Sequence, residues 1–189
     1  GVGINALDAL TTGDGNTAVG YNALTTNSAG VYNIGIGSNA LGNANYGQMM
    51  VAVGNNAGAV VTSGDFCTLI GGKAGDSLTG NDSNYNLLLG YESGENLTTG
   101  AGNIIIGSVD AASATGDRQL MITGYDGTTT TTWISGDSSG NLTFAANTTI
   151  GGNLIIGSAT VTEAQLEVLD GATITTTELN LIDGGATIG

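Results

Sequence analysis

The chain contains no histidine and no proline, and only one cysteine, one tryptophan and two basic residues among its 189 positions. Without histidine, neither a Ser-His-Asp nor a Cys-His catalytic arrangement can be built, and no imidazole can bind a metal. The single cysteine, Cys67, rules out an internal disulfide framework. No apolar run approaches the ~18 residues that a membrane-spanning helix requires, so we expect no membrane insertion.

The shortage of basic residues leaves the chain strongly acidic. Sixteen acidic residues give a formal net charge of -14, which disfavours partners such as nucleic acid and anionic membrane surfaces. Charged residues nevertheless make up only 10% of the chain, so Asn, Thr, Ser and Gly must form most of its surface. The chain begins without Met, inside one repeat, and ends inside another, so we expect it to be a piece of a longer protein.

Glycine is abundant, with 34 residues that recur at fixed places. The repeats align on the glycine that follows each short apolar run, and these anchor glycines are spaced by 17, 17, 17, 17, 19 and 17 residues. The seven anchors are Gly3, Gly20, Gly37, Gly54, Gly71, Gly90 and Gly107. A constant period of this kind predicts a solenoid in which each repeat forms one coil.

A short strand is predicted just before each anchor. Aliphatic or β-branched residues stand one and three positions before it, as in Thr17 and Val19 or Ile34 and Ile36. This alternation is typical of a strand with one inward face, and we expect these side chains to form the interior. Stacked coils then lie about 4.8 Å apart, and equivalent residues form ladders along the axis.

Other repeat positions predict corners and ladders. A small residue three places after the anchor indicates a tight inner corner, at Ala6, Ala23, Ala40, Ala57, Ala74 and Ser93. A second glycine ten places after it indicates a positive-φ turn, at Gly13, Gly30, Gly47, Gly64 and Gly100. Asn recurs at the strand entry and two places after the anchor. A column of large side chains comprises Tyr32, Met49, Phe66 and Tyr85.

A second apolar set lies further along each coil, at Leu7, Leu24 and Leu41, with Leu10, Val61, Leu78 and Leu97. We expect these side chains to be exposed in a lone solenoid, and large exposed apolar stripes mark interfaces. The sequence therefore predicts self-association, and three chains around one axis are the simplest closed arrangement for a long shaft. A monomeric β-solenoid is the alternative.

The pattern changes after residue 116, where the solenoid repeats of 1–116 end. Residues 117–158 read as several short strands with frequent turn signals, and we expect a small interleaved β module. Within it, the string Asn153 to Ser158 echoes Asn103 to Ser108, as if one coil returned. Residues 159–189 contain two units 13 residues apart, VTEAQLEVLDGAT and ITTTELNLIDGGAT, which predict short helical turns.

Catalytic and metal-binding chemistry is not expected. The carboxylate pairs Glu92 with Glu95 and Asp76 with Asp82 could in principle hydrolyse glycans, but solvated turn acids are the better interpretation. Residues 137–141 imitate part of a calcium loop, yet they lack its spacing and its final Glu. Cys67 takes a ladder position otherwise held by Asn, which predicts a buried and inert thiol. We predict no catalytic, cofactor-binding or metal-binding residue.

Two aromatic residues are candidates for receptor contact. Tyr125 and Trp133 are of the kind that binds a receptor saccharide, and packing of Trp133 at a trimer axis is equally compatible with the sequence.

The strings NTAVGYNAL, NIGIGSNAL and MVAVGNNAG resemble the "NTAIGYNAL" repeat of phage tail fibres and of bacterial surface fibres that end in an intramolecular chaperone. More distantly, they resemble the head repeats of trimeric autotransporter adhesins, a parallel β-roll. The tail string TTTELNLIDG resembles the "TAAELNILDG" units of phage tail fibres. The longer period of 17 departs from the adhesin heads, and the chain has no chaperone or peptidase segment.

The resemblance implies an all-β protein: a trimeric parallel β-solenoid or β-roll, then a small β module and short C-terminal helical turns. It implies the shaft of a tail fibre in the virion, which supports host attachment and has no enzymatic activity. The expected partners are two further copies of the chain, other fibre or tail proteins at its ends, and a host surface glycan or protein receptor. The alternatives are a trimeric adhesin on a bacterial surface and, less favoured, a glycan depolymerase.

Overall fold

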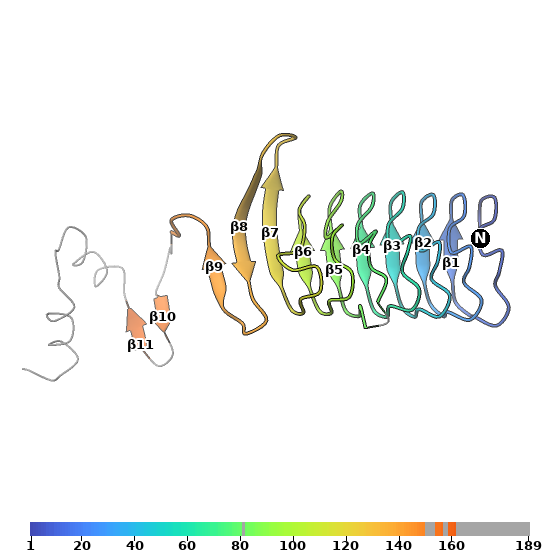
Figure 1. The fold of residues 1–189 in the computed structure, drawn as a ribbon, viewed down its shortest axis with the longest axis horizontal. Coiled ribbons are helices and arrows are strands. Elements are labelled where there is room, and N and C mark those ends of the chain that lie inside the picture. Colours follow the sequence, from blue (N-terminus) through green and yellow to red (C-terminus); the bar gives the residue numbers. More distant parts are fainter. Residues whose placement is uncertain (81, 150–153, 157–158, 162–189) are drawn as a thin grey trace, which may run out of the picture. The chain divides into compact units, whose positions relative to one another are not determined.

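The computed structural model describes residues 1–80, 82–149, 154–156 and 159–161. The chain divides into two units, residues 1–146 and 147–189. In the first unit, nine strands form one sheet in which the spatial order follows the chain from β1 to β9 (Figure 1). The described residues are all-β and contain no helix, and the predicted β-solenoid is confirmed. The predicted helical turns fall mostly within residues 162–189, outside the described residues.

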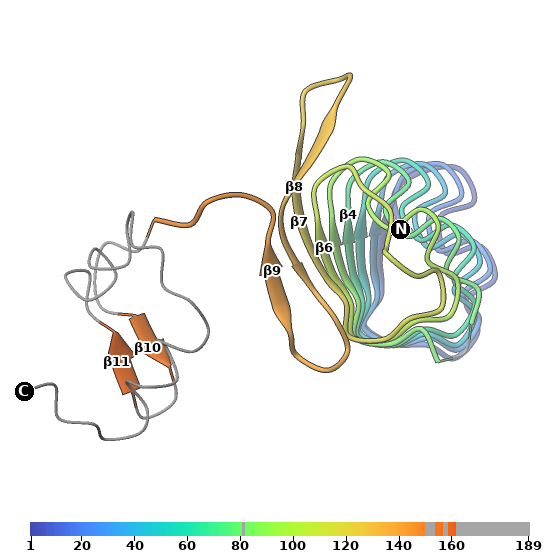
Figure 2. The same cartoon turned by 60° about the vertical axis from the view of Figure 1, so that its left-hand side comes forward.

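Six three-residue strands form the regular part of the solenoid, one in each coil. Neighbouring strands pair in parallel and in register, so residues one repeat apart in the sequence lie side by side. The strands are β1 (Thr17–Val19), β2 (Ile34–Ile36), β3 (Val51–Val53), β4 (Thr68–Ile70), β5 (Leu87–Leu89) and β6 (Ile104–Ile106). Figure 2 shows the coils stacked behind one another, with the strands along one side.

The anchor glycines stack directly on one another. All seven have φ between 115° and 140°, a region that L side chains rarely adopt. A Cβ on Gly71 would collide with the carbonyl oxygen of Gly90, and the same collision recurs at the other anchors. The anchors are therefore glycine for two reasons, backbone conformation and contact between coils.

The interior of the solenoid differs from the prediction. The central residue of each strand is buried, whereas the aliphatic residues on either side of it point outward. The core is instead built from these central residues, from the small corner residues such as Ala40, and from most of the second apolar set. Leu24, Leu41, Val61, Leu78 and Leu97 are all at most 1% exposed. For these five residues the expected exposure was wrong, because each coil folds back over them. Leu10 in the first coil is 37% exposed, and Leu7 is partly buried.

A buried ladder of polar side chains runs through the strand entries, as predicted. Asn86 donates from Nδ2 to the carbonyl of Gly100 (2.9 Å), and its Oδ1 accepts the N–H of Asn103 (2.9 Å). The ladder ends at Gln119, whose N–H is accepted by Asn103 Oδ1 (2.8 Å). Buried backbone groups at the strand entry therefore find side-chain partners from coil to coil.

The second glycine of each coil has a different cause from the one predicted. Gly13, Gly30, Gly47, Gly64 and Gly100 are absent from the positive-φ residues, so the predicted positive-φ turn was wrong. A Cβ on Gly47 would lie 2.7 Å from the carbonyl oxygen of Gly64, which places a side chain against the backbone of the next coil. Close approach between coils, not turn conformation, requires glycine here.

The sheet continues past the last regular coil. Strand β7 (Leu120–Tyr125) pairs in parallel with β6, and then β8 (Thr130–Gly136) and β9 (Leu142–Phe144) add antiparallel strands. Figures 1 and 2 show the β7–β8 hairpin extending beyond the coils. The predicted strands of 117–158 therefore include three that continue the solenoid sheet, and a domain boundary at residue 116 stays a prediction.

The second unit contains one short pair of strands among its described residues. Strand β10 (Leu154–Ile156) pairs antiparallel with β11 (Ala159–Val161). Residues 154–156 of the segment that echoes the sixth coil therefore pair antiparallel with β11 and not in parallel with another coil.

Candidate functional site

The outward side chains of β1 to β6 are aliphatic except for Thr17 and Thr68, and they form a largely apolar surface, here called the outer sheet face. The third residues of these strands form one column in continuous register, and Val19, Ile36, Ile70 and Leu89 are each 37–41% exposed. None of the six strands contains a charged residue. Parallel sheets normally have both faces covered. In the described residues of one chain, only the inner face of this sheet is covered.

A column of large side chains stands at the corner that leads into the strands. Tyr32, Met49, Phe66 and Tyr85 have φ between 52° and 60°, in the left-handed region, and are 40–63% exposed. Glycine takes this corner in two other coils, at Gly15 and Gly102, with φ of 71° and 67°. A bulky residue at positive φ costs about 1–2 kcal/mol, so the column carries conformational strain.

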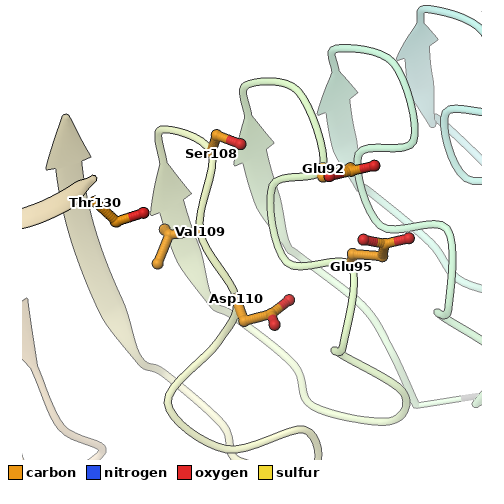
Figure 3. A pocket seen from close by; sticks show the side chains of 6 residues that line it. All are labelled: Glu92, Glu95, Ser108, Val109, Asp110 and Thr130. Carbon is orange, nitrogen blue, oxygen red and sulfur yellow. The ribbon is translucent and has the colours of Figure 1, made fainter. Parts of the chain in front are cut away.

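Glu92 and Glu95, which were considered and disfavoured for glycan hydrolysis, do not form an isolated carboxylate pair. Lys73 Nζ lies 2.9 Å from Glu92 Oε1 and 3.6 Å from Glu95 Oε1. Its hydrogen bond to Glu92 raises the pKa of Lys73, and the same bond is the largest cause of the lowered pKa of Glu92. Figure 3 shows Glu92 and Glu95 on one side of a hollow of about 350 Å³, with Asp110 and Thr130 on the other.

The two carboxylates of the second pair, Asp76 and Asp82, lie in different environments. Burial raises the pKa of Asp76, and the nearby Glu95 carboxylate raises it further, while Asp82 is exposed. No group of three or more His, Cys, Asp or Glu side chains in the described part of the chain is arranged to hold a metal ion.

The segment that imitates a calcium loop forms a hydrogen-bonded turn between β8 and β9. Asp137 Oδ1 accepts the N–H groups of Ser139 (2.9 Å) and Asn141 (3.0 Å), and Oδ2 accepts Asn141 Nδ2 (2.8 Å). These bonds, led by that of the Asn141 side chain, lower the pKa of Asp137. Both carboxylate oxygens are engaged within the loop, which supports its interpretation as a turn.

Cys67 is 1% exposed and lies in the ladder, as predicted. Its thiol donates to the carbonyl oxygen of Ser83 (3.0 Å), and burial raises its pKa. A thiol that is buried and neutral at pH 7 is a poor nucleophile, because the thiolate is the reactive form.

The structure brings the two receptor-contact candidates together. Tyr125 ends β7 and Trp133 lies in β8, and both line a hollow of about 330 Å³ on the β7–β8 hairpin. The other lining residues are Gly124, Asp126, Thr129 and Thr131. Sequence reasoning missed these four residues. The turn sequence Tyr125-Asp126-Gly127 was a signal that could have found them, because a turn between two strands brings the side chains near its ends together.

Comparison of the chain with protein-family models, curated proteins and solved structures finds no match. The likeness to tail-fibre repeats therefore depends on the quoted motifs and on the solenoid itself. No helix in the described ranges has the length and hydropathy needed to cross a membrane.

Proposed function

We propose that this chain is a shaft segment of a phage tail fibre, assembled as a homotrimer in the virion. Its role is mechanical: it holds a host-attachment tip away from the particle and connects at its ends to other fibre or tail proteins. The single observation that carries the proposal is the outer sheet face, an uncharged apolar surface that runs across all six regular coils.

The physical argument concerns what covers that face. Exposed apolar columns that continue over several coils are typical of interaction surfaces. The columns repeat at the coil spacing, and another copy of the chain presents columns with the same spacing. A second copy aligned in parallel therefore matches the outer sheet face rung by rung, and cyclic symmetry closes such a contact with three chains. The buried Leu residues that first suggested self-association contribute nothing to this argument.

The strained corner column adds to the same surface. Phe66 and Tyr85 adjoin the strand entries and are 40% and 63% exposed. Their left-handed backbone conformation costs free energy, with φ of 59° and 60°. We propose that burial of these rings between copies of the chain offsets this free-energy cost, since aromatic side chains contribute strongly to interfaces.

Sedimentation of the purified chain tests the assembly. We expect a species of three chains, and a stable 18.5 kDa species at micromolar concentration would contradict the proposal. Ile70→Glu places a charge on the outer sheet face and should release single chains, because the buried carboxylate would be unpaired. Asn43→Glu is the matched control, since Asn43 is exposed in a turn outside the strands.

Location is tested separately by immunogold electron microscopy with an antibody raised against this chain. Labelling along thin fibres on virions is expected. Labelling of a bacterial envelope without virions would favour the adhesin alternative and overturn the assignment to a tail fibre.

A further inference from the structure

A β-bulge on the β7–β8 hairpin redirects the only tryptophan of the chain. Ile122 pairs with Ile134, but the next pair is Thr123 with Thr132, so Trp133 is the extra residue on β8. Trp133 is 56% exposed, which is unusual for so large an apolar side chain. Bulges occur preferentially where a strand must re-aim a side chain, often beside functional sites.

Gly124 supplies the space into which the redirected ring fits. A Cβ at this position would lie 2.6 Å from Trp133 Cζ2 and 2.8 Å from Cη2, so any other residue would displace the indole. Gly124 is not among the positive-φ residues, so backbone conformation does not explain this glycine. The redirected indole lines the same hollow as Tyr125, whose side chain is also half exposed (51%).

The residues that line the hollow beside these rings include two threonines and one aspartate. Asp126 Oδ1 accepts the N–H groups of Thr128 (2.9 Å) and Thr129 (2.8 Å). Asp126 Oδ2 makes no hydrogen bond within the described residues, and two hydroxyl-bearing residues, Thr129 and Thr131, line the same hollow. The backbone bonds, that of Thr129 first, lower the pKa of Asp126, so the carboxylate is an ionised acceptor at neutral pH.

We infer that this hollow is a binding site for an uncharged sugar unit. A pyranose has an apolar C–H face that packs on an aromatic ring and a rim of hydroxyls that donate and accept hydrogen bonds. Trp133 and Tyr125 provide the ring surface, and Asp126 Oδ2 and the two threonine hydroxyls provide the polar partners. The volume of about 330 Å³ lies at the lower end of the range for small-ligand pockets.

The negative charge of the site favours neutral sugars over anionic ones. Neither of the two basic residues, Lys73 and Arg118, lines the hollow, and the chain has a net charge of -14. An anionic sugar would meet Asp126 without a compensating cation, so sialic and uronic acids are disfavoured. The residues that line the site belong to one hairpin, and none of them belongs to the outer sheet face on β1 to β6. A failure of either proposal is therefore distinguishable from a failure of the other.

Trp133 itself reports on binding, because its fluorescence is the only indole signal of the chain. The native chain is titrated with glucose, galactose, mannose and N-acetylglucosamine, with glucuronate and choline as charged probes. We expect a saturable change in emission with at least one neutral sugar, and a dissociation constant on the order of millimolar, as for one open subsite.

Matched variants connect this signal to the site. Asp126→Asn keeps Oδ1 for the turn but removes the charged acceptor, and should weaken sugar binding by about tenfold or more. Asp137→Asn changes the equivalent turn aspartate between β8 and β9 and should leave affinity unchanged. Tyr125→Ala should weaken binding, whereas Tyr46→Ala, which removes an exposed ring outside the hollow, should not. Amide NMR spectra verify that each variant is folded.

Three results would overturn the inference. The first is the lack of a saturable response to any of the four neutral sugars. The second is unchanged affinity in folded Asp126→Asn and Tyr125→Ala. The third is a response to choline or glucuronate without one to neutral sugars, which would assign the hollow to a charged ligand.

Discussion

A methyl group on Gly58 would lie 2.6 Å from Leu69 Cδ1, so the leucine of β4 fills the space that the glycine leaves. Leu24 and Gly35 are in contact in the same way, but here the glycine is at the centre of the strand. A Cβ on Gly35 would lie 3.1 Å from Leu24 Cγ. Along the solenoid, Leu7, Leu24 and Leu41 face small strand centres, and Gly58, Gly75 and Gly94 face large ones. Each coil therefore places one large side chain at this level of its core.

This reciprocity predicts strong coupling between Gly58 and Leu69. Leu69→Ala should lower the free energy of unfolding by about 2–5 kcal/mol through the cavity it creates. Gly58→Leu should also destabilise, because its side chain collides with Leu69. The double variant recreates the Leu41–Ala52 arrangement. Its loss in the free energy of unfolding should be smaller than the summed losses of the two single variants by about 2 kcal/mol or more. Urea unfolding measures all three.

The control for this cycle combines Leu69→Ala with Gly94→Leu. A Cβ on Gly94 meets Ile105 and Leu88 and not Leu69, so these two effects should add. Equal coupling in both cycles would contradict a specific Gly58–Leu69 contact.

The corner column predicts an unusual order of stabilities at Phe66. Its ring stacks on Tyr85 with centroids 5.0 Å apart and planes at 6°. Phe66→Ala should destabilise by about 1–2 kcal/mol, because it loses the stack and retains a strained φ of 59°. Phe66→Gly loses the same stack but releases the strain, so it should be about 1 kcal/mol more stable than the Ala variant.

Phe144 is the control for this order. It lies in β9, is 51% exposed and is not among the positive-φ residues. There the ordinary ranking should hold, with Ala more stable than Gly. Thermal unfolding of the four variants measures both orders, and Ala more stable than Gly at residue 66 would contradict the strain argument.

The buried ladder predicts a large cost for truncating Asn86. Asn86→Ala leaves the carbonyl of Gly100 and the N–H of Asn103 buried without these partners. Each such group costs about 1–3 kcal/mol, so a loss of about 2–6 kcal/mol is expected for the two. Asn43→Ala removes an exposed amide and should change stability by less than about 0.5 kcal/mol. Denaturant midpoints measure the two variants, and equal losses would count against the ladder.

Acidity should act on two aspartates in opposite directions. The folded-state pKa of Asp137 is lowered, so its contribution is present above the ordinary Asp value of about 3.9 and is lost as pH falls through the folded value. The pKa of Asp76 is raised by burial, so its contribution is present below that ordinary value and is lost as pH rises through the folded value.

Urea unfolding between pH 7 and pH 3 tests these signs. The decline in stability toward low pH should be smaller in Asp137→Asn than in the parent chain, and steeper in Asp76→Asn. Identical profiles in both variants and the parent would contradict the assigned shifts.

Much of the solenoid follows from the sequence alone. The repeat period located the six strands β1 to β6 and every anchor glycine, since a repeated coil needs its sharpest bend at the same place each time. Small corners such as Ala40 and the Asn ladder were equally readable, because they recur at one position. The sequence also contains the inverse relation in size between residues such as Gly58 and Leu69. It becomes visible only when the position four residues after the anchor is compared with the centre of the next strand.

Tertiary structure alone decided which side of each strand is inside. Alternation along Ile34-Gly35-Ile36 defines two faces but does not say which one turns inward. A small residue at the centre of a strand leaves a void in the core of its coil. A Leu from elsewhere in the coil must fill that void. That packing requirement buried Leu24 and left the aliphatic residues outside. It also took a bulge, which pattern alone does not predict, to bring Trp133 beside Tyr125.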